Sequence, residues 1–247
     1  MDRLIYTALS GMQSSMNRQR VIASNMANAQ TVGFRAELLD QRPVTVEGDS
    51  LEVRAMQNAE VRGAIMDPGP VVETGNPLDV AIQGDALLAV QAEDGSEAYT
   101  RRGDLSISPT GLLVNGEGLP VMGEAGPITV PLGGKPSIAP DGMVLVTDPA
   151  APDQPPQEAG RIKLAGWQGS PISKGLDGLF RVEGGGALPS DPLARVNTGS
   201  LEGSNVNPTK ALVDMIEASR AWDNQLKLIT TARELDDATA DLMRLPN

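Results

Sequence analysis

Adjacent acidic side chains are the first candidates for chemistry in this sequence. Pairs occur at Glu93 and Asp94 and at Asp236 and Asp237, and two neighbouring carboxyl groups can divide acid and base roles when their environments separate their pKa values. The first pair falls in a predicted turn, however, and the second falls on a water-exposed face of a predicted helix. We therefore expect neither pair to catalyse acid–base chemistry.

Other chemical functions are limited by composition. The sequence has no cysteine and no histidine, which excludes disulfides, thiol nucleophiles, the usual zinc sites and every histidine-dependent triad. No Asp-x-Asp-x-Asp-Gly calcium loop is present, and residues 184–186 lack the strand-to-helix context of a phosphate loop. A net charge of −12, from 20 basic and 32 acidic residues, repels nucleic acid. We predict no cofactor, no metal, no nucleic-acid partner and no enzymatic activity.

Apolar side chains near both ends of the chain form a candidate site of another kind, an assembly interface. Residues 1–28 and 208–243 carry apolar groups three and four positions apart, which is typical of an amphipathic helix. Such helices bury their stripes best against each other and against neighbouring copies, although the methionines also permit a target-binding face. The predicted interface consists of Ile5, Leu9, Met12, Met16, Met26, Leu212, Met215, Trp222, Leu226 and Ile229.

The middle of the chain follows a different pattern, with many glycines, prolines and β-branched residues. Apolar runs there stand next to Asp94-Gly95, Asn115-Gly116, Asp141-Gly142 and Asp177-Gly178, and such pairs predict hairpins with type I′ turns. We predict an α+β fold, mainly β by residue count. Paired terminal helices (1–34 and 203–247) form a discontinuous coiled-coil domain, which brackets a linker-like segment (35–75) and a turn-rich antiparallel β domain (76–202).

No part of the sequence favours the membrane. No run approaches the roughly 18 apolar residues of a spanning helix, and the N-terminal stretch lacks the apolar core of a secretory signal peptide. We expect no membrane insertion, and any export by a route that leaves the N-terminus intact. The lack of cysteine suits a chain that crosses a channel unfolded.

Four separated motifs, in order along the chain, resemble those of the bacterial flagellar rod and hook proteins. Residues 24–35 are similar to the Asn-Asn-Leu-Ala-Asn and Thr-x-Gly-Phe-Lys/Arg signature, and the other matches are residues 74–85, 99–101 and 201–207. The resemblance implies helices paired around an export channel, with the β domain outside. It also implies helix-to-linker junction residues, of which the asparagines satisfy backbone groups. These are Asn25, Asn28, Gly33, Phe34, Asn205 and Asn207.

The resemblance further implies a structural, self-assembling subunit of the periplasmic rod. Its partners would be other flagellar axial proteins, copies of itself, and the flagellar type III export apparatus in transit. Its helices would become ordered only on incorporation. Residues 1–6 and the chain length favour a proximal position in the rod, with a distal rod or hook-type protein as the alternative. A rival from another class is a secreted β-domain hydrolase or adhesin with helical flanks.

Overall fold

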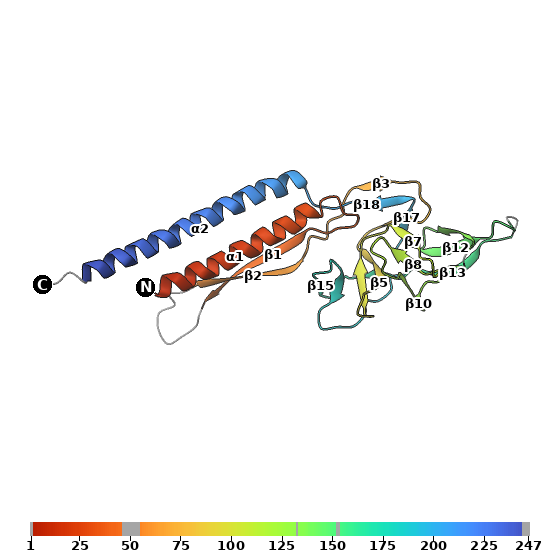
Figure 1. Cartoon of the computed structure of the whole chain (residues 1–247). Coiled ribbons are helices and arrows are strands. Elements are labelled where there is room, and N and C mark those ends of the chain that lie inside the picture. The colour runs from red at the N-terminus through yellow and green to blue at the C-terminus, as the bar shows by residue number, and fades with distance from the viewer. Residues whose placement is uncertain (1, 46–54, 132, 152–153, 244–247) are drawn as a thin grey trace. The chain divides into compact units, whose positions relative to one another are not determined.

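The structure is a computed structural model that describes residues 2–45, 55–131, 133–151 and 154–243. Helix α1 (Asp2–Ala27) is the first element of the sequence and helix α2 (Pro208–Met243) is the last, and all the strands come between them in sequence (Figure 1). The predicted α+β class, with terminal helices on either side of a β domain, is confirmed. The strands are β1 (Glu37–Thr45), β2 (Ala55–Ala64), β3 (Val71–Glu73), β4 (Val80–Ile82), β5 (Ala86–Gln91), β6 (Glu97–Thr100), β7 (Leu105–Ile107), β8 (Leu113–Asn115), β9 (Met122–Gly123), β10 (Gly126–Pro127), β11 (Lys135–Ile138), β12 (Met143–Thr147), β13 (Gln157–Arg161), β14 (Leu164–Gly166), β15 (Ile172–Lys174), β16 (Phe180–Val182), β17 (Val196–Thr198) and β18 (Ser200–Glu202).

The chain divides into two compact units. Residues 1–27, 37–62 and 207–247 form one, called here the helical unit, and residues 28–36 and 63–206 form the other, the β unit. The chain therefore passes between the units four times, after residues 27, 36, 62 and 206. This division corrects the predicted boundaries. Residues 28–34 belong with the β unit, and much of the predicted linker belongs with the helical unit.

In the helical unit the two helices lie side by side, with the first residues of α1 and the last residues of α2 at the same end (Figure 1). Asn207 caps α2, because its Oδ1 accepts the backbone N–H of Lys210 at 3.0 Å. Pro208 follows at the first helical position, where its missing N–H costs nothing. Local sequence thus fixes where the long helix begins.

Strands β1 and β2 correct the linker-like assignment of residues 35–75. They pair with each other in a two-stranded sheet, and β1 contacts α1. Both strands contain polar residues, and β1 contains Pro43, so neither shows an alternating apolar pattern. A two-stranded sheet needs support from another element, and α1 provides it. Residues 46–54 of the predicted linker and residues 244–247 of the predicted helical domain lie outside the described residues.

The β unit is built around a five-stranded sheet in the order β14-β5-β6-β16-β15. Strand β5 buries both of its faces, with Leu88 and Val90 in one apolar cluster and Leu87 and Ala89 in the other. The larger cluster continues through aliphatic side chains of the neighbouring strands. The core therefore depends on aliphatic packing, as expected for a chain with 2% aromatic residues.

The hairpin turns differ from the predicted type I′. Among the described residues only glycines have positive φ, so no Asp or Asn adopts the left-handed conformation that a type I′ turn requires. At residues 92–95, 139–142 and 175–178 the fourth residue is a positive-φ glycine whose N–H donates to the carbonyl of the first. In each, the Asp before that glycine accepts the N–H two residues on. At Asn115 the corresponding glycine is Gly118 rather than Gly116.

Candidate assembly site

The two terminal helices contact each other, and two small side chains of α2 are buried. Ala211 and Ala218 of α2 lie seven residues apart and are buried, and Gln225 continues the same spacing. The Nε2 of Gln19 donates to the backbone O of Ala218 at 3.4 Å, and a methyl group added at Gly11 would lie 3.6 Å from Nε2 of Gln225. The helices therefore approach each other closely near Gly11, Gln19 and Ala218.

The predicted interface residues differ in how far they are exposed. Met12, Met215, Trp222 and Ile229 are partly buried, and the side chain of Ile5 lies outside the described ones. Five other members are exposed, with 40% to 57% of their surface accessible: Leu9, Met16, Met26, Leu212 and Leu226. The structure adds Val213, Ile216 and Leu228 as exposed apolar residues of α2. Pairing of the helices within one chain leaves all of these side chains uncovered.

A second feature lies in the β unit, where three chain segments meet. We call residues 28–36, 63–70 and 199–206 the neck. Strand β18 pairs with β3 just after the second segment, with Leu201 opposite Val72. The N–H of Gly33 donates to the backbone O of Glu202 at 2.7 Å, and the N–H of Ile65 donates to the O of Ala36 at 2.8 Å. Backbone bonds thus join all three segments.

Glu202 is a buried carboxylate at the centre of the neck. Its Oε1 accepts Nη2 of Arg35 at 2.7 Å and the N–H of Gly69 at 2.9 Å. Its Oε2 accepts Nε of Arg101 at 2.8 Å and contacts Nη2 of Arg101 at 2.6 Å. A buried charge is stable only when it is paired and hydrogen-bonded, and Glu202 meets both conditions.

Arg101 uses the whole of its guanidinium group. Nη1 donates to the carbonyls of Gly84 and Ala86 at 2.8 and 2.6 Å, and Nη2 donates to the carbonyl of Ile82 at 2.8 Å. Burial lowers the pKa of Arg101 from its usual value; Glu202 opposes this effect and the nearby Arg35 adds to it. The group still remains charged at any physiological pH.

Arg35 makes fewer contacts although it is equally buried. Beside its bond to Glu202, its Nε and Nη1 have no hydrogen-bond partner among the residues that the structure describes. The buried cluster of Arg35, Arg101 and Glu202 therefore carries two positive charges and one negative charge. Glu202 forms an ion pair with each of the two buried arginines and so offsets the cost of burying their charges.

The junction residues predicted from the resemblance fall into two places. Gly33, Phe34 and Asn205 meet in the neck, where Nζ of Lys174 lies 3.6 Å from the centre of the Phe34 ring. Asn28 also lies in the neck, and its backbone O accepts the N–H of Thr31.

Asn25 and Asn207 lie in the helical unit instead. Asn207 is the cap of α2 described above. Asn25 bonds both backbone groups of Glu37: its Oδ1 accepts the N–H at 2.7 Å, and its Nδ2 donates to the O at 3.1 Å.

Sequence reasoning did not select the charged residues of the neck. Arg35, Arg101 and Glu202 lie inside the matched motifs, at residues 24–35, 99–101 and 201–207. Their positions in the sequence give no sign that they pair across more than 100 residues. Location within the motifs was the one signal that could have pointed to them.

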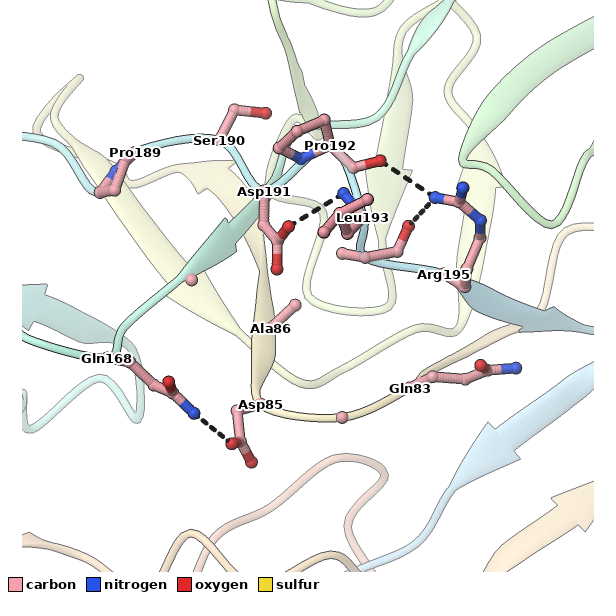
Figure 2. Close-up of a pocket in the computed structure, with 13 residues that line it drawn as sticks. Gln83, Asp85, Ala86, Gln168, Pro189, Ser190, Asp191, Pro192, Leu193 and Arg195 are labelled. Atoms are coloured by element: carbon pink, nitrogen blue, oxygen red, sulfur yellow. Dashed lines mark hydrogen bonds between the residues drawn. The ribbon is translucent and has the colours of Figure 1, made fainter.

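A pocket of about 590 Å3 in the β unit tests the hydrolase alternative (Figure 2). Its charged side chains bond to the pocket wall. Asp85 accepts Nε2 of Gln168 at 2.7 Å, Asp191 accepts the N–H of Leu193 at 2.9 Å, and Arg195 donates to the carbonyl of Pro192 at 3.0 Å. Among the described residues that line it, none of these bonds joins a nucleophile to a base.

In the described part of the chain, no helix has the length and apolar character needed to span a bilayer. The same residues include no group of three or more Asp or Glu side chains placed to hold a metal ion.

Comparison with known protein families defines the class of protein to which these two features belong. Residues 5–35 match the family model described as flagella basal body rod protein. Residues 81–146 match the flagellar hook protein FlgE/F/G D1 domain, and residues 197–242 match the C-terminal region of flagellar basal body rod FlgEFG proteins. The chain belongs to the flagellar basal-body rod protein family and is a structural rod subunit.

Individual relatives match along almost the whole length. The chain is 44% identical to the flagellar basal-body rod protein FlgF of Salmonella typhimurium, over 99% of this chain and 100% of the relative. It is 46% identical to FlgF of Escherichia coli, over 94% of each. Identity to the flagellar basal-body rod protein FlgG of Bacillus subtilis is 30%, over 99% of this chain and 100% of the relative. Within the family, the chain is FlgF-like.

Proposed function

We propose that this chain is an axial subunit of the proximal rod that is built into the rod through its terminal helices. Two observations favour the proximal position. The chain is 44% and 46% identical to FlgF proteins but 30% identical to a FlgG protein. Residues 1–6 also resemble the N-terminus of the proximal rod protein. In this proposal the helices pair within the subunit and contact copies of the chain and other axial proteins through their exposed large apolar residues.

The observation that carries the proposal is the exposed apolar surface of α1 and α2. Among the side chains that the structure describes, the paired helices still expose eight large apolar ones. Contiguous exposed apolar surface marks an interaction site, and burying one such side chain is worth about 1.5–3 kcal/mol. Neighbouring subunits would cover this surface in the rod.

Location and route belong to the same proposal. The rod segment would lie in the periplasm, reached through the flagellar export apparatus without removal of a signal peptide. The absence of cysteine supports passage of an unfolded chain through an oxidising compartment without crosslinks. The role would be mechanical and not catalytic.

Substitutions on α2 test the proposal in cells that lack their own copy of the gene. Leu212→Gln with Leu226→Gln removes exposed apolar surface while keeping helix propensity, so we expect loss of swarming and of the chain from isolated basal bodies. Leu176→Gln, at a β-unit side chain that is 96% exposed, is the control and should retain both. Full swarming of the double variant would contradict the proposal. Normal swarming with altered surface adhesion would favour the adhesin alternative.

A further inference from the structure

All four passages of the chain between the two units run through the neck. The segments at residues 28–36, 63–70 and 199–206 contain the β-unit ends of these passages. They continue in sequence into α1, strands β1 and β2, and α2. Whatever fixes the neck therefore fixes the residues from which every element of the helical unit extends.

Two side chains of the third segment bind both of the other segments. Glu202 binds Arg35 of the first segment and Gly69 of the second. Asn205 accepts the N–H of Ala36 at 2.7 Å and donates through Nδ2 to the carbonyls of Ile65 and Asp67 at 2.7 and 2.9 Å.

Both donors of the Asn205 amide and its oxygen are engaged in these three bonds. The backbone N–H of Asn205 also donates to Phe34 O at 3.2 Å. An amide group has few equivalent arrangements that satisfy all of its bonds. Because both donors and the acceptor oxygen are engaged, Asn205 also selects the register in which the segments meet.

Every partner atom in this network belongs to the β unit. The hydrogen bonds of Glu202 and Asn205 in this network therefore all form within one subunit. What the helices do next rests on the proposed function, in which they contact neighbouring subunits in the rod.

We propose that Glu202 and Asn205 are positioning residues that close the neck in the free subunit, before α1, β1–β2 and α2 are ordered by neighbours. A free subunit then already holds the starting points of these elements in their final register. Closure reduces the number of chain conformations that the helices must lose on incorporation.

The two arginines differ in how replaceable they are. Arg35 makes one side-chain hydrogen bond to Glu202, which the single ammonium group of lysine can also make. Arg101 spreads five contacts over four residues, which lysine cannot reproduce. Arg35→Lys is therefore the conservative variant, and Arg35→Met removes the bond while leaving Arg101 and Glu202 paired.

Hydrogen–deuterium exchange of the full chain, at a concentration where it is monomeric, tests the proposal. We expect peptides covering residues 31–36, 64–70 and 200–206 to exchange as slowly as β5, and α1 and α2 to exchange faster. Glu202→Gln should accelerate exchange in all three neck segments at least tenfold, and Arg35→Met should accelerate residues 31–36 at least tenfold. Arg35→Lys and the exposed-residue control Glu183→Gln should match the unsubstituted chain.

Neck segments that exchange as fast as the helices in the unsubstituted chain would overturn the proposal. So would unchanged neck exchange in Arg35→Met, a variant that keeps the Arg101–Glu202 pair and so remains informative if Glu202→Gln does not fold. These outcomes concern the free subunit alone. They are therefore distinct from failure of the proposed function, which the swarming of the α2 variants reports.

Discussion

At the scale of single residues, two adjacent arginines in the β unit perform different tasks. Arg101 is buried and serves a buried carboxylate and three carbonyl groups. Arg102 is partly exposed and pairs with Asp104 at 2.8 Å and Glu117 at 3.1 Å. Buried and exposed ion pairs differ in what their loss costs, and these neighbours allow a direct comparison.

Arg101→Met should destabilise the β unit by about 3–5 kcal/mol, because the carbonyl groups of Ile82, Gly84 and Ala86 lose a donor and the buried Glu202 loses a partner. Arg102→Met should cost about 1 kcal/mol or less, since water can replace its contacts. Urea unfolding followed by circular dichroism measures both. Equal costs would show that burial of the Arg101 site does not determine its contribution.

The backbone at residue 33 leaves no room for a side chain, so only glycine fits there without strain. Its φ is +66°, and a Cβ there would lie 2.4 Å from the carbonyl carbon of Arg101. Gly184 has a φ of +86° but open space around it. Gly184→Ala should therefore cost only the left-handed conformation, about 1–2 kcal/mol.

Gly33→Ala adds a clash with backbone to that cost, so its melting temperature should be clearly lower than that of Gly184→Ala. Thermal unfolding of the two variants side by side makes the comparison. Similar melting temperatures would mean that residues 28–36 can leave the neck without cost.

At the scale of elements, what could be predicted depended on whether local sequence determines the structure. The long helix α2 was predictable from Asn207, Pro208 and its apolar spacing, because capping and periodicity are local. Strands β1 and β2 were not predictable, because they depend on each other and on α1. The Asp-Gly pairs marked turns correctly, but the turn type depends on the φ of the residue before glycine.

On α2 the structure buries Ala211 and Ala218 and leaves the neighbouring Leu212 54% exposed. An apolar period predicts that a helix has a buried face. It cannot tell a face buried within one chain from a face that a neighbouring subunit would cover.

Ala218 provides the test at this scale. Ala218→Leu would overpack the contact with α1 by about 1–3 kcal/mol, so we expect reduced swarming in complemented cells. Ala218→Ser conserves the small size and should swarm normally. Full swarming of the leucine variant would show that the helices are not closely packed in the rod.

At the scale of the whole molecule, the two units differ in how much of their apolar surface is buried. The β unit has its own aliphatic core and includes the neck. The helical unit exposes much of its large apolar surface. The family could be predicted from the resemblance to rod and hook proteins. Which helix residues are buried and which are exposed could be seen only in the structure.

This difference predicts how the free chain behaves. At micromolar concentration, circular dichroism should report less helix than the 26 residues of α1 and the 36 of α2, because isolated helices without a covered apolar face are marginal in water. Strand signal should be unaffected. Full helicity of a monomeric sample would contradict ordering on incorporation.

Electron cryomicroscopy of isolated basal bodies tests most directly whether the terminal helices build this chain into the rod. We expect density for this chain in the proximal rod, with Ala211 and Ala218 at the contact between α1 and α2, and with Leu212, Ile216 and Leu226 against neighbouring subunits. A rod without this chain would contradict the proposed function. So would a rod in which these exposed side chains face solvent while the β unit makes the contacts between subunits.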